Sequence, residues 1–416
     1  MEPYETLAQE VIARGNVALT EDEVKVLEAA PDSHLISKKL LGAHYFNVGM
    51  GADAIRCIRH VYSAARTPEN ASNLVSALSK AGAIEDAIAI AEEEDTPLLP
   101  VTQASYLSEL YGRAKKPGKN RHWARRALKL KEGEAPELED RAAPIVRPFN
   151  PETPERNIIA FSLFGDGKRY LEGAIRNCIV ARYMYPGWTP RFYVDDSVPV
   201  EARNGLTAAG AQLKMVPNLP ALRFGLYWRF LVEDDPEVDV YIVRDADSIP
   251  TIKERVAVQD WLASGEPFHV MRDWVTHTEL VLAGMWGAHR GNITGGMGRK
   301  ILDFSKTREN ILNSRVDDQL FLRREIWPYM RGRTFVQDSH FGYGESALFN
   351  PDYLMPGEMH IGQNDLAVRD NDRKKKAVAA HNAKVKAAKD KAAKPTAKAQ
   401  AKPAKAKRKV TVKKSK

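Results

Sequence analysis

The sequence has little cysteine and lacks a long apolar run. Cys57 and Cys178 are the only cysteines in 416 residues, which excludes a disulfide framework or a structural zinc site. No stretch approaches the ~20 consecutive apolar residues of a membrane-spanning helix. The N-terminal MEPYETLAQEVIARG carries three glutamates and no apolar core, so it is not a secretory signal. Together these absences predict a soluble, cytoplasmic protein.

Acidic residues are almost absent from the end of the chain. Residues 373–416 contain 18 Lys and Arg against one acid, a net charge of +17. Residues 1–372 carry 44 basic and 53 acidic residues, a net charge of −9. Because residues 371–416 have almost no large apolar side chains, they are predicted to be a disordered Lys/Ala/Pro-rich tail. We expect this tail to bind nucleic acid or the anionic inner face of a membrane, or to act as a solubilising extension.

Residues 1–130 are rich in Ala, Leu and Glu at helical spacing and contain few strand formers. One set of positions fits the spacings of a tetratricopeptide repeat: Leu41, Gly42, Tyr45, Gly49, Ala54 and Ile58. Gly82 and Ala87 recur 33 residues after Gly49 and Ala54. A third copy keeps the periodicity but departs in spacing: Tyr111, Ala124 and Leu128. The first copy resembles the tetratricopeptide family; the alternative is an unrelated bundle of helical hairpins. Either arrangement suits a surface that binds a protein partner.

Proline marks the end of this helical pattern. Residues 131–156 contain five prolines and many charges, and they are predicted to be a linker. Beyond them, apolar strands alternate with helical stretches, which predicts an α/β domain with a largely parallel sheet over residues 157–370. The expected strands are 157–164, 191–194, 212–216, 238–243, 268–271 and 282–286. The expected helices are 168–185, 222–232, 298–306 and 317–327.

Two carboxylates, Asp245 and Asp247, follow the expected strand 238–243 directly. In open α/β sheets, ligands bind beyond the carboxyl ends of the strands. Strand alternation would place both acids on the same side of the chain. Two hard oxygen ligands at that position suit Mn²⁺ or Mg²⁺ that also binds a diphosphate. The alternative is a turn that caps the next helix.

An Asp-x-Asp motif after a fourth strand resembles the GT-A nucleotide-sugar glycosyltransferases. Further stretches, in their order and spacing, resemble a subgroup of bacterial and viral GT-A proteins: Tyr193–Asp196, Tyr227–Phe230, Phe268–Asp273, Ala283–Gly287, Val316–Gln319 and His360–Gln363. The resemblance covers residues 157–370. It implies a GT-A Rossmann-like mixed sheet and a metal-dependent glycosyltransferase with a nucleotide-sugar donor. The acceptor would be a glycan, a lipid-linked glycan or a protein.

The same resemblance implies contacts with the donor from residues near several strand ends: Phe161, Ser162, Asp195, Arg229, Asp245, Gly284 and Trp286. The first three would hold the base and ribose. Arg229 would pair with the diphosphate or steady the aspartates, since a guanidinium binds oxygen anions bidentately. Gly284 would let the backbone approach a sugar, on which Trp286 would stack. The structural alternatives are a turn for Asp195, a surface salt bridge for Arg229 and core packing for Trp286.

Catalytic roles are implied for three further acids. Asp317 and Asp318 precede Gln319 and would lie beside the transferred sugar, while Asp273 follows the fifth strand next to the predicted site. The alternative for the first two is a helix start, where exposed amides favour acids. The resemblance also implies a histidine as third metal ligand, and the candidates are His340 and His360. The alternative for each histidine is a structural role.

Two other functions compete with sugar transfer. A haloacid-dehalogenase-like phosphatase also uses Asp-x-Asp, but it carries the motif on its first strand and needs a following Thr. Here Ser-Ile-Pro follows the motif. The second alternative is a non-catalytic helical-repeat scaffold with a degenerate sugar-nucleotide-binding domain and a polyanion-binding tail. Binding of a nucleoside diphosphate in the presence of Mn²⁺ separates these hypotheses.

Overall fold

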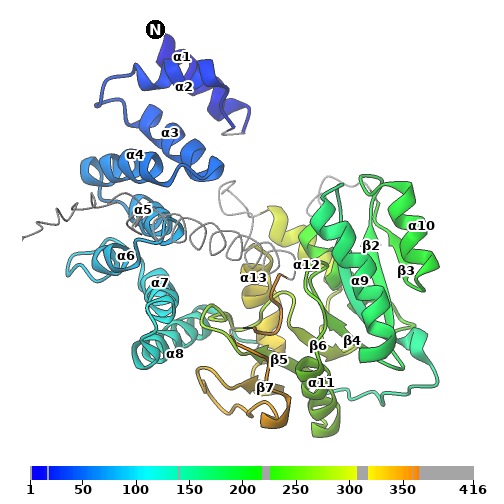
Figure 1. Ribbon diagram of the computed structural model, residues 1–416. Helices are drawn as coiled ribbons and strands as arrows, with labels where there is room; N and C mark the ends of the chain where they lie inside the picture. The colour runs from blue at the N-terminus through cyan, green and yellow to red at the C-terminus, as the bar shows by residue number, and fades with distance from the viewer. Residues whose placement is uncertain are drawn as a thin grey trace, which may run out of the picture. The chain divides into compact units, whose positions relative to one another are not determined.

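A computed structural model describes residues 2–15, 18–138, 141–217, 225–306, 317–357 and 359–364 (Figure 1). The tail 371–416 lies outside the described residues, and so does the prediction that it is disordered. Within the described ranges, no helix is long and apolar enough to cross a membrane. The helices up to residue 134 form the helical region, and the described residues from 157 onward form the sheet region.

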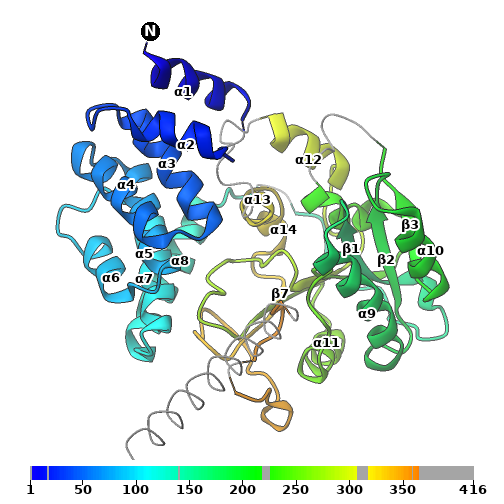
Figure 2. The ribbon, with the colours of Figure 1, turned by 45° about the horizontal axis from the view of Figure 1, so that its top comes forward.

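The helical region consists of helices that follow one another in antiparallel pairs, as Figures 1 and 2 show for α3 to α8. Their bounds are α1 Pro3–Ala13, α2 Glu21–Glu28, α3 Leu35–Val48, α4 Gly51–Ala64, α5 Pro68–Lys80, α6 Ile84–Ala91, α7 Pro100–Arg113 and α8 Pro117–Glu134. Adjacent helices α3 and α4 approach closely at a glycine, which has no side chain. A Cβ atom built on Gly42 of α3 would lie 2.7 Å from Ile58 Cγ1 of α4. Glycine at this position is therefore required by packing.

The turns that join α3 to α4, α5 to α6 and α7 to α8 repeat every 33 residues. Gly49 (φ 84°), Gly82 (φ 83°) and Lys115 (φ 55°) occupy the left-handed position of the three turns. In each turn the next amide donates to the carbonyl five residues earlier, at 2.9 Å. The prediction that the third copy departs in spacing is therefore wrong. A lysine has replaced the glycine that marks the turn, so the sequence pattern hides the third repeat.

Helix α8 also belongs to the core of the sheet region. Ala124, Leu128 and Ala135 are buried in the same apolar cluster as residues of the sheet. Lys131 donates from Nζ to the carbonyl of Thr278 at 2.7 Å. The first four residues of the predicted linker are thus helical, and they are anchored to the sheet region. The described residues between α8 and residue 153 form neither helix nor strand.

A seven-stranded mixed sheet organises the sheet region, in the order β3-β2-β1-β4-β6-β5-β7 (Figure 1). Its strands are β1 Asn157–Leu163, β2 Thr189–Val194, β3 Gln212–Met215, β4 Val240–Val243, β5 Phe268–Arg272, β6 Trp286–His289 and β7 Thr334–Asp338. Strands β3, β2, β1 and β4 are parallel, and β6 runs antiparallel to β4 and β5. The predicted α/β class is confirmed. Strand β6 begins four residues later than expected, and β7 was not predicted.

Helices cover both faces of this sheet. They are α9 Lys168–Met184, α10 Val200–Ala208, α11 Ile252–Ser264, α12 Met297–Lys306, α13 Asp317–Phe321 and α14 Trp327–Met330. The expected helix 222–232 is a 3₁₀ helix over Gly225–Asp234, and residues 222–224 lie outside the described ranges.

Alternate residues of the central strands enter two separate cores. In β4, Val240 and Ile242 pack with α9, α10 and α11, whereas Tyr241 and Val243 pack with the 3₁₀ helix, α12 and α13. Strand β1 alternates in the same way. Both strands are therefore buried on both faces, as expected for central parallel strands.

Candidate functional site

The carboxyl ends of β1 and β4 form a topological switch point. The chain places β2 and β3 on one side of β1 and then crosses to place β4 on the other side. A crevice opens beyond the strand ends at such a point, and ligands of open α/β sheets bind there. In the β1–β4 register Ala160 pairs with Val243. Asp245 and Asp247 follow immediately, so the predicted motif lies at the switch point.

The motif is a turn whose backbone is fixed by α9. Asn177 donates from Nδ2 to the carbonyl oxygen of Ala246 at 2.9 Å. A Cβ atom built on Gly173 would lie only 2.3 Å from the same oxygen. The next helix, α11, is capped by Thr251, whose Oγ1 accepts from the amide of Glu254. The two aspartates therefore do not serve as the cap of that helix.

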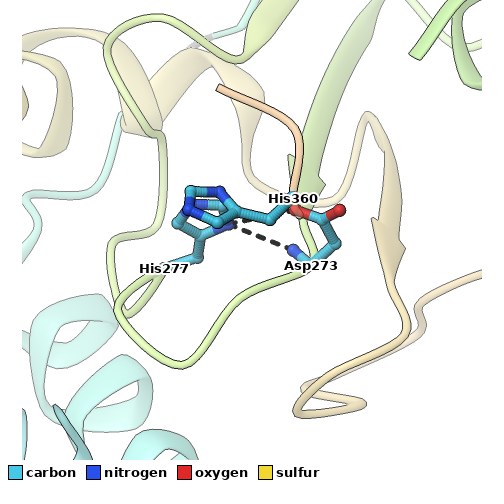
Figure 3. A group of neighbouring side chains, drawn as sticks. All are labelled: Asp273, His277 and His360. Atoms are coloured by element: carbon cyan, nitrogen blue, oxygen red, sulfur yellow. Dashed lines mark hydrogen bonds and ion pairs between the residues drawn. The ribbon is translucent and has the colours of Figure 1, made fainter. Parts of the chain in front are cut away.

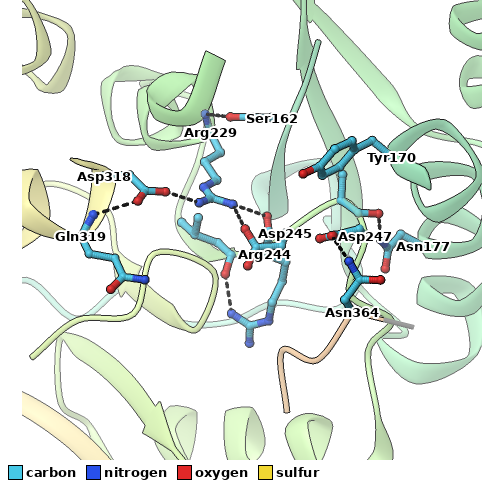
Figure 4. A network of polar contacts seen from close by, with 12 residues as sticks. Ser162, Tyr170, Asn177, Arg229, Arg244, Asp245, Asp247, Asp318, Gln319 and Asn364 are labelled. Atoms are coloured by element: carbon cyan, nitrogen blue, oxygen red, sulfur yellow. Dashed lines mark hydrogen bonds and ion pairs between the residues drawn. The ribbon is translucent and has the colours of Figure 1, made fainter. Parts of the chain in front are cut away.

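Asp245 belongs to a chain of charged side chains, Asp245–Arg229–Asp318 (Figure 4). Arg229 pairs through Nη1 with Asp245, and through Nη2 with Asp318 Oδ2 at 2.9 Å. The side chains of Arg229 and Asp318 are only 5% and 6% exposed, whereas that of Asp245 is 41% exposed. Ser162 Oγ accepts from the amide of Arg229 at 2.9 Å and so ties the 3₁₀ helix to β1. The buried Arg229 guanidinium is therefore paired with a solvent-accessible carboxylate, that of Asp245.

Burial shifts the pKa of Asp318 and of the neighbouring Asp247. It raises the pKa of Asp318 to about 6, against the lowering effect of the Arg229 charge, and the Asp245 charge raises it further. The pKa of Asp247 is also raised, first by burial and then by the charge of Asp245. Burial alone would lower the pKa of Arg229, but the two carboxylates raise it. The site thus combines a permanent cation with an acid that titrates near neutral pH.

Asp247 has different partners from Asp245. Its Oδ2 pairs with Arg169 of α9 at 2.6 Å and accepts from Asn364 Nδ2 at 2.6 Å. Strand alternation does not set its direction, because residues 246 and 247 form a turn. Ser248 and Asn364 also form an isolated antiparallel bridge. Neither Arg169 nor Asn364 was predicted from the sequence; the only signal for Asn364 was its place just after His360–Gln363.

Two predicted donor contacts have other functions in the structure. A Cβ atom built on Gly284 would lie 2.2 Å from Asp245 Oδ2, so this glycine makes room for the carboxylate. Trp286 is fully buried, with its ring against Phe230 and Tyr241. Its indole is therefore not available to stack on a sugar, and the core alternative is the correct one.

The remaining predicted donor residues lie near the same strand ends. Phe161 is fully buried and stacks on Phe192, so only its backbone can face a ligand. Asp195 lies in the turn after β2 and accepts from the amide and the hydroxyl of Ser197. Asp317, which was predicted as a catalytic acid, is buried beside Asp318 at the start of α13. Asp195 therefore lies in a turn, as the structural alternative for this residue proposed.

A second group of ionisable side chains lies beyond β5, at the same edge of the sheet. It consists of Asp273, His277 and His360 (Figure 3). In the described part of the chain, this is the one group of three or more His, Cys, Asp or Glu whose ligand atoms all lie within 4.8 Å of one another. His340 instead donates from Nε2 to Asn120 Oδ1 of α8 at 3.0 Å. Neither predicted histidine ligand therefore forms such a group with Asp245 and Asp247.

Burial favours the neutral form of two imidazoles here, His277 and His340. Burial lowers the pKa of His277 well below its ordinary value, and the nearby histidines lower it further. Burial also lowers the pKa of His340. His277, four residues after Asp273, was not counted among the metal ligands predicted from the sequence.

No protein-family model matches the sequence, and no curated protein matches it. Among solved structures, the chain is similar to a mutant O-GlcNAc transferase of Thermobaculum terrenum at 19% identity and a TM-score of 0.37, over 58% of this chain and 45% of that chain. A crystal structure of a mycobacterial protein matches at 16% identity and a TM-score of 0.26, over 37% of this chain and 62% of that chain. The chain spans less than two thirds of either structure, and likeness at this level carries no argument about function.

Proposed function

We propose that the chain is a metal-dependent glycosyltransferase of the GT-A type, which transfers a sugar from a nucleotide-diphosphate sugar to an acceptor hydroxyl. One observation carries the proposal. Asp245 and Asp247 leave the fourth strand at the switch point beside β1, and the buried Arg229 holds the first of them. This is the position that the resemblance to GT-A enzymes implies for an Asp-x-Asp motif. A phosphatase of the haloacid-dehalogenase type would carry the motif on its first strand.

The side chains of this site fit a hard divalent cation. Both potential ligands are carboxylates, which Mn²⁺ and Mg²⁺ prefer, and the Asp245 side chain is accessible. Asp245, Asp247 and Asp318 carry three negative charges when ionised, against two positive charges on Arg229 and Arg169. A divalent ion changes this net charge from −1 to +1, which complements a diphosphate. The ion would neutralise charge on the diphosphate that leaves with the nucleotide.

The chain's own residues would bind and orient the donor. Ser162 positions Arg229 by accepting a hydrogen bond from its backbone amide, and the Arg229 side chain keeps Asp245 in place. Asp195, at the end of β2, would accept hydrogen bonds from the ribose or base. Gly284 contributes by leaving space for Asp245 rather than by touching a sugar. Trp286 has no part in the donor site.

Asp318 is the proposed catalytic acid–base residue. A pKa of about 6 leaves Asp318 ionised at pH 7. This pKa is also close enough to neutral pH for the carboxylate to accept a proton from an acceptor hydroxyl. Asp317 and Asp273 are proposed to assist beside the transferred sugar. The resemblance offered His340 and His360 as histidine ligands of the Asp245–Asp247 ion, but neither lies in a group with these two aspartates. In the structure both bond elsewhere.

The acceptor and the partners are proposals of the same kind. A glycan or lipid-linked acceptor suits a protein whose tail 373–416 carries a net charge of +17, since such a tail binds the anionic face of a membrane or nucleic acid. The tetratricopeptide-like helical region would bind a protein partner. We therefore propose a location in the cytoplasm, peripheral to the inner face of a membrane.

The test is a screen of nucleotide sugars with the full chain. Release of nucleoside diphosphate from uridine, guanosine, cytidine and thymidine nucleotide sugars is measured with and without Mn²⁺. We expect turnover of at least one donor, dependent on the metal and lost in Asp247→Asn. The matched control is Gly118→Ala on α8, where a Cβ meets no atom within 4 Å. Failure of every nucleoside diphosphate to bind in the presence of Mn²⁺ would contradict the proposal.

A further inference from the structure

We propose that Asp273, His277 and His360 form a second metal site, which binds an imidazole-preferring divalent ion of the Zn²⁺ class. This site differs from the Asp245–Asp247 pair in position and in ligand chemistry. It does not depend on the proposed glycosyltransferase activity. The argument rests on which atoms of the three side chains already have partners.

Asp273 offers one free carboxylate oxygen. Its Oδ2 accepts from Lys253 Nζ at 2.9 Å and from the amide of Ile361 at 3.1 Å. Its Oδ1 accepts no hydrogen bond from any described residue, although Asp273 as a whole is only 8% exposed. A buried carboxylate oxygen without a donor is uncommon and calls for an explanation, such as an ion. One oxygen is therefore anchored while the other is available as a ligand.

His360 presents one nitrogen in the same way. Its Nδ1 lies 2.8 Å from the carbonyl oxygen of Ile361, which can only accept, so Nδ1 carries the proton. With the proton on Nδ1, a metal ion would bind through Nε2. Metal-ligating histidines usually donate their other ring N–H to a carbonyl or carboxylate, which fixes the tautomer. Trp274 also stacks on the His360 ring, with 4.9 Å between centroids.

His277 and Asp273 are spaced for a small ion. Their facing atoms, His277 Nδ1 and Asp273 Oδ1, lie 3.4 Å apart. Two bonds of about 2.1 Å at a tetrahedral angle separate the ligand atoms by about 3.4 Å. Nδ1 of His277 now accepts from the amide of Asp273 at 3.1 Å, so its lone pair points toward Asp273 (Figure 3). Binding exchanges that hydrogen bond for a bond to the ion.

The ligand set selects the type of ion. Two imidazoles and one carboxylate suit Zn²⁺ and its neighbours in the first transition row, whereas Mg²⁺ and Ca²⁺ prefer oxygen ligands alone. Three protein ligands leave a coordination position for water or another ligand, as in open zinc sites. His360 is half-buried, which gives the ion a route from solvent. The Lys253 ammonium balances the Asp273 charge and so moderates the affinity for a cation.

Co²⁺ is the probe for this site, because its visible spectrum distinguishes low-coordinate nitrogen ligation from octahedral oxygen ligation. The metal-free full chain is titrated with Co²⁺, and Zn²⁺ is then added to displace it. We expect the wild type to bind one equivalent with an intense absorption band that Zn²⁺ abolishes. His277→Ala and His360→Ala should each lose the band. His122→Ala, a control at an exposed histidine of α8, should keep it.

Asp247→Asn separates this proposal from the proposed function. The variant should keep the Co²⁺ band even where it loses sugar transfer. The proposal is overturned if the band persists in both histidine variants, or if Asp247→Asn removes it. His360 is half-buried, so its variant is expected to fold; circular dichroism melting of both histidine variants checks that loss of the band is not loss of structure.

Discussion

Two groups of ionisable side chains lie at the same edge of one sheet, but they are built in opposite ways. Around Asp245 and Asp247, every carboxylate is paired with a guanidinium or an amide, and the ligands are hard oxygens. Around Asp273, two imidazoles accompany one carboxylate whose Oδ1 has no hydrogen-bond donor among the described residues. The first group is suited to a cation that arrives with a phosphorylated ligand. The second is suited to an ion that the protein binds by itself.

The largest effect is expected from a substitution that disrupts the first group and leaves the second group intact. Asp247→Asn removes one negative charge from the proposed metal and diphosphate site while keeping the side-chain shape. We expect turnover of the nucleotide sugar to fall by about 10²–10³-fold, the scale on which loss of one preorganised electrostatic contact acts. Initial rates at saturating Mn²⁺ measure it. Unchanged turnover at equal metal concentration would remove Asp247 from the site.

The pH dependence of stability tests the buried acid of the first group. Burial raises the pKa of Asp318 to about 6, above the ~3.9 of an unfolded chain. Between these values the folded state binds more protons than the unfolded state, so the free energy of unfolding falls as pH rises from about 4 to about 6. The fall contributed by Asp318 is about 3 kcal/mol, at about 1.4 kcal/mol for each pH unit.

Asp318→Asn is neutral at every pH and should lack this contribution. Urea unfolding at pH 4 and pH 7, in the presence of a chelator, measures the difference for both proteins. The same pH dependence in the variant and the wild type would show that Asp318 titrates normally in the folded state.

Zinc should stabilise the protein through the second group alone. At a free Zn²⁺ concentration 100 times the dissociation constant, a site present only in the folded state adds about 2.7 kcal/mol to the free energy of unfolding. Urea unfolding with and without Zn²⁺ should show this gain in the wild type and in Asp247→Asn. His360→Ala should show none. Equal stabilisation of His360→Ala would place the ion elsewhere.

A smaller effect is expected from Gly284→Ala, which acts on the first group by crowding. The added Cβ would lie 2.2 Å from Asp245 Oδ2 and must displace this carboxylate. Misplacement of a reacting group by about 1 Å can cost up to about 10²-fold in rate, and we expect a loss of tenfold to a hundredfold. Steady-state rates measure the loss, with Gly118→Ala as the unaffected control. The Co²⁺ band of the second group should be unchanged.

Short-range patterns predicted where in the fold the two aspartates of the first group lie. An apolar strand followed by two acids placed Asp245 and Asp247 correctly after β4. Arg229 lies where the sequence reading expected it, beside the motif, although its helix is 3₁₀. The direction of Asp247 was not predictable, because alternation ends where the turn begins. Its partner Asn364 lies 117 residues further along the chain.

The errors have physical causes that local patterns do not record. The apolar run 282–286 was read as a strand, but residues 282–285 form a buried turn, in which Gly284 leaves room for Asp245. Lys115 hides the third helical repeat, because a lysine takes the left-handed conformation that usually marks a glycine. His360 meets His277 only because the end of the described chain returns to the sheet edge. No spacing rule connects positions so far apart.

The segment His360–Asn364 touches both groups, and this has a consequence for how they respond to occupancy. At one end His360 lies with His277, and the amide of Ile361 holds Asp273; at the other end Asn364 bonds to Asp247. If donor binding also holds Asp247 and Asn364 in this arrangement, an ion that fixes His360 lowers the conformational entropy that donor binding must still remove. Thermodynamic reciprocity then requires the donor to tighten binding of the ion by the same factor. Five residues of backbone would thus make donor affinity a reporter of transition-metal supply, with no contact between the ion and the nucleotide.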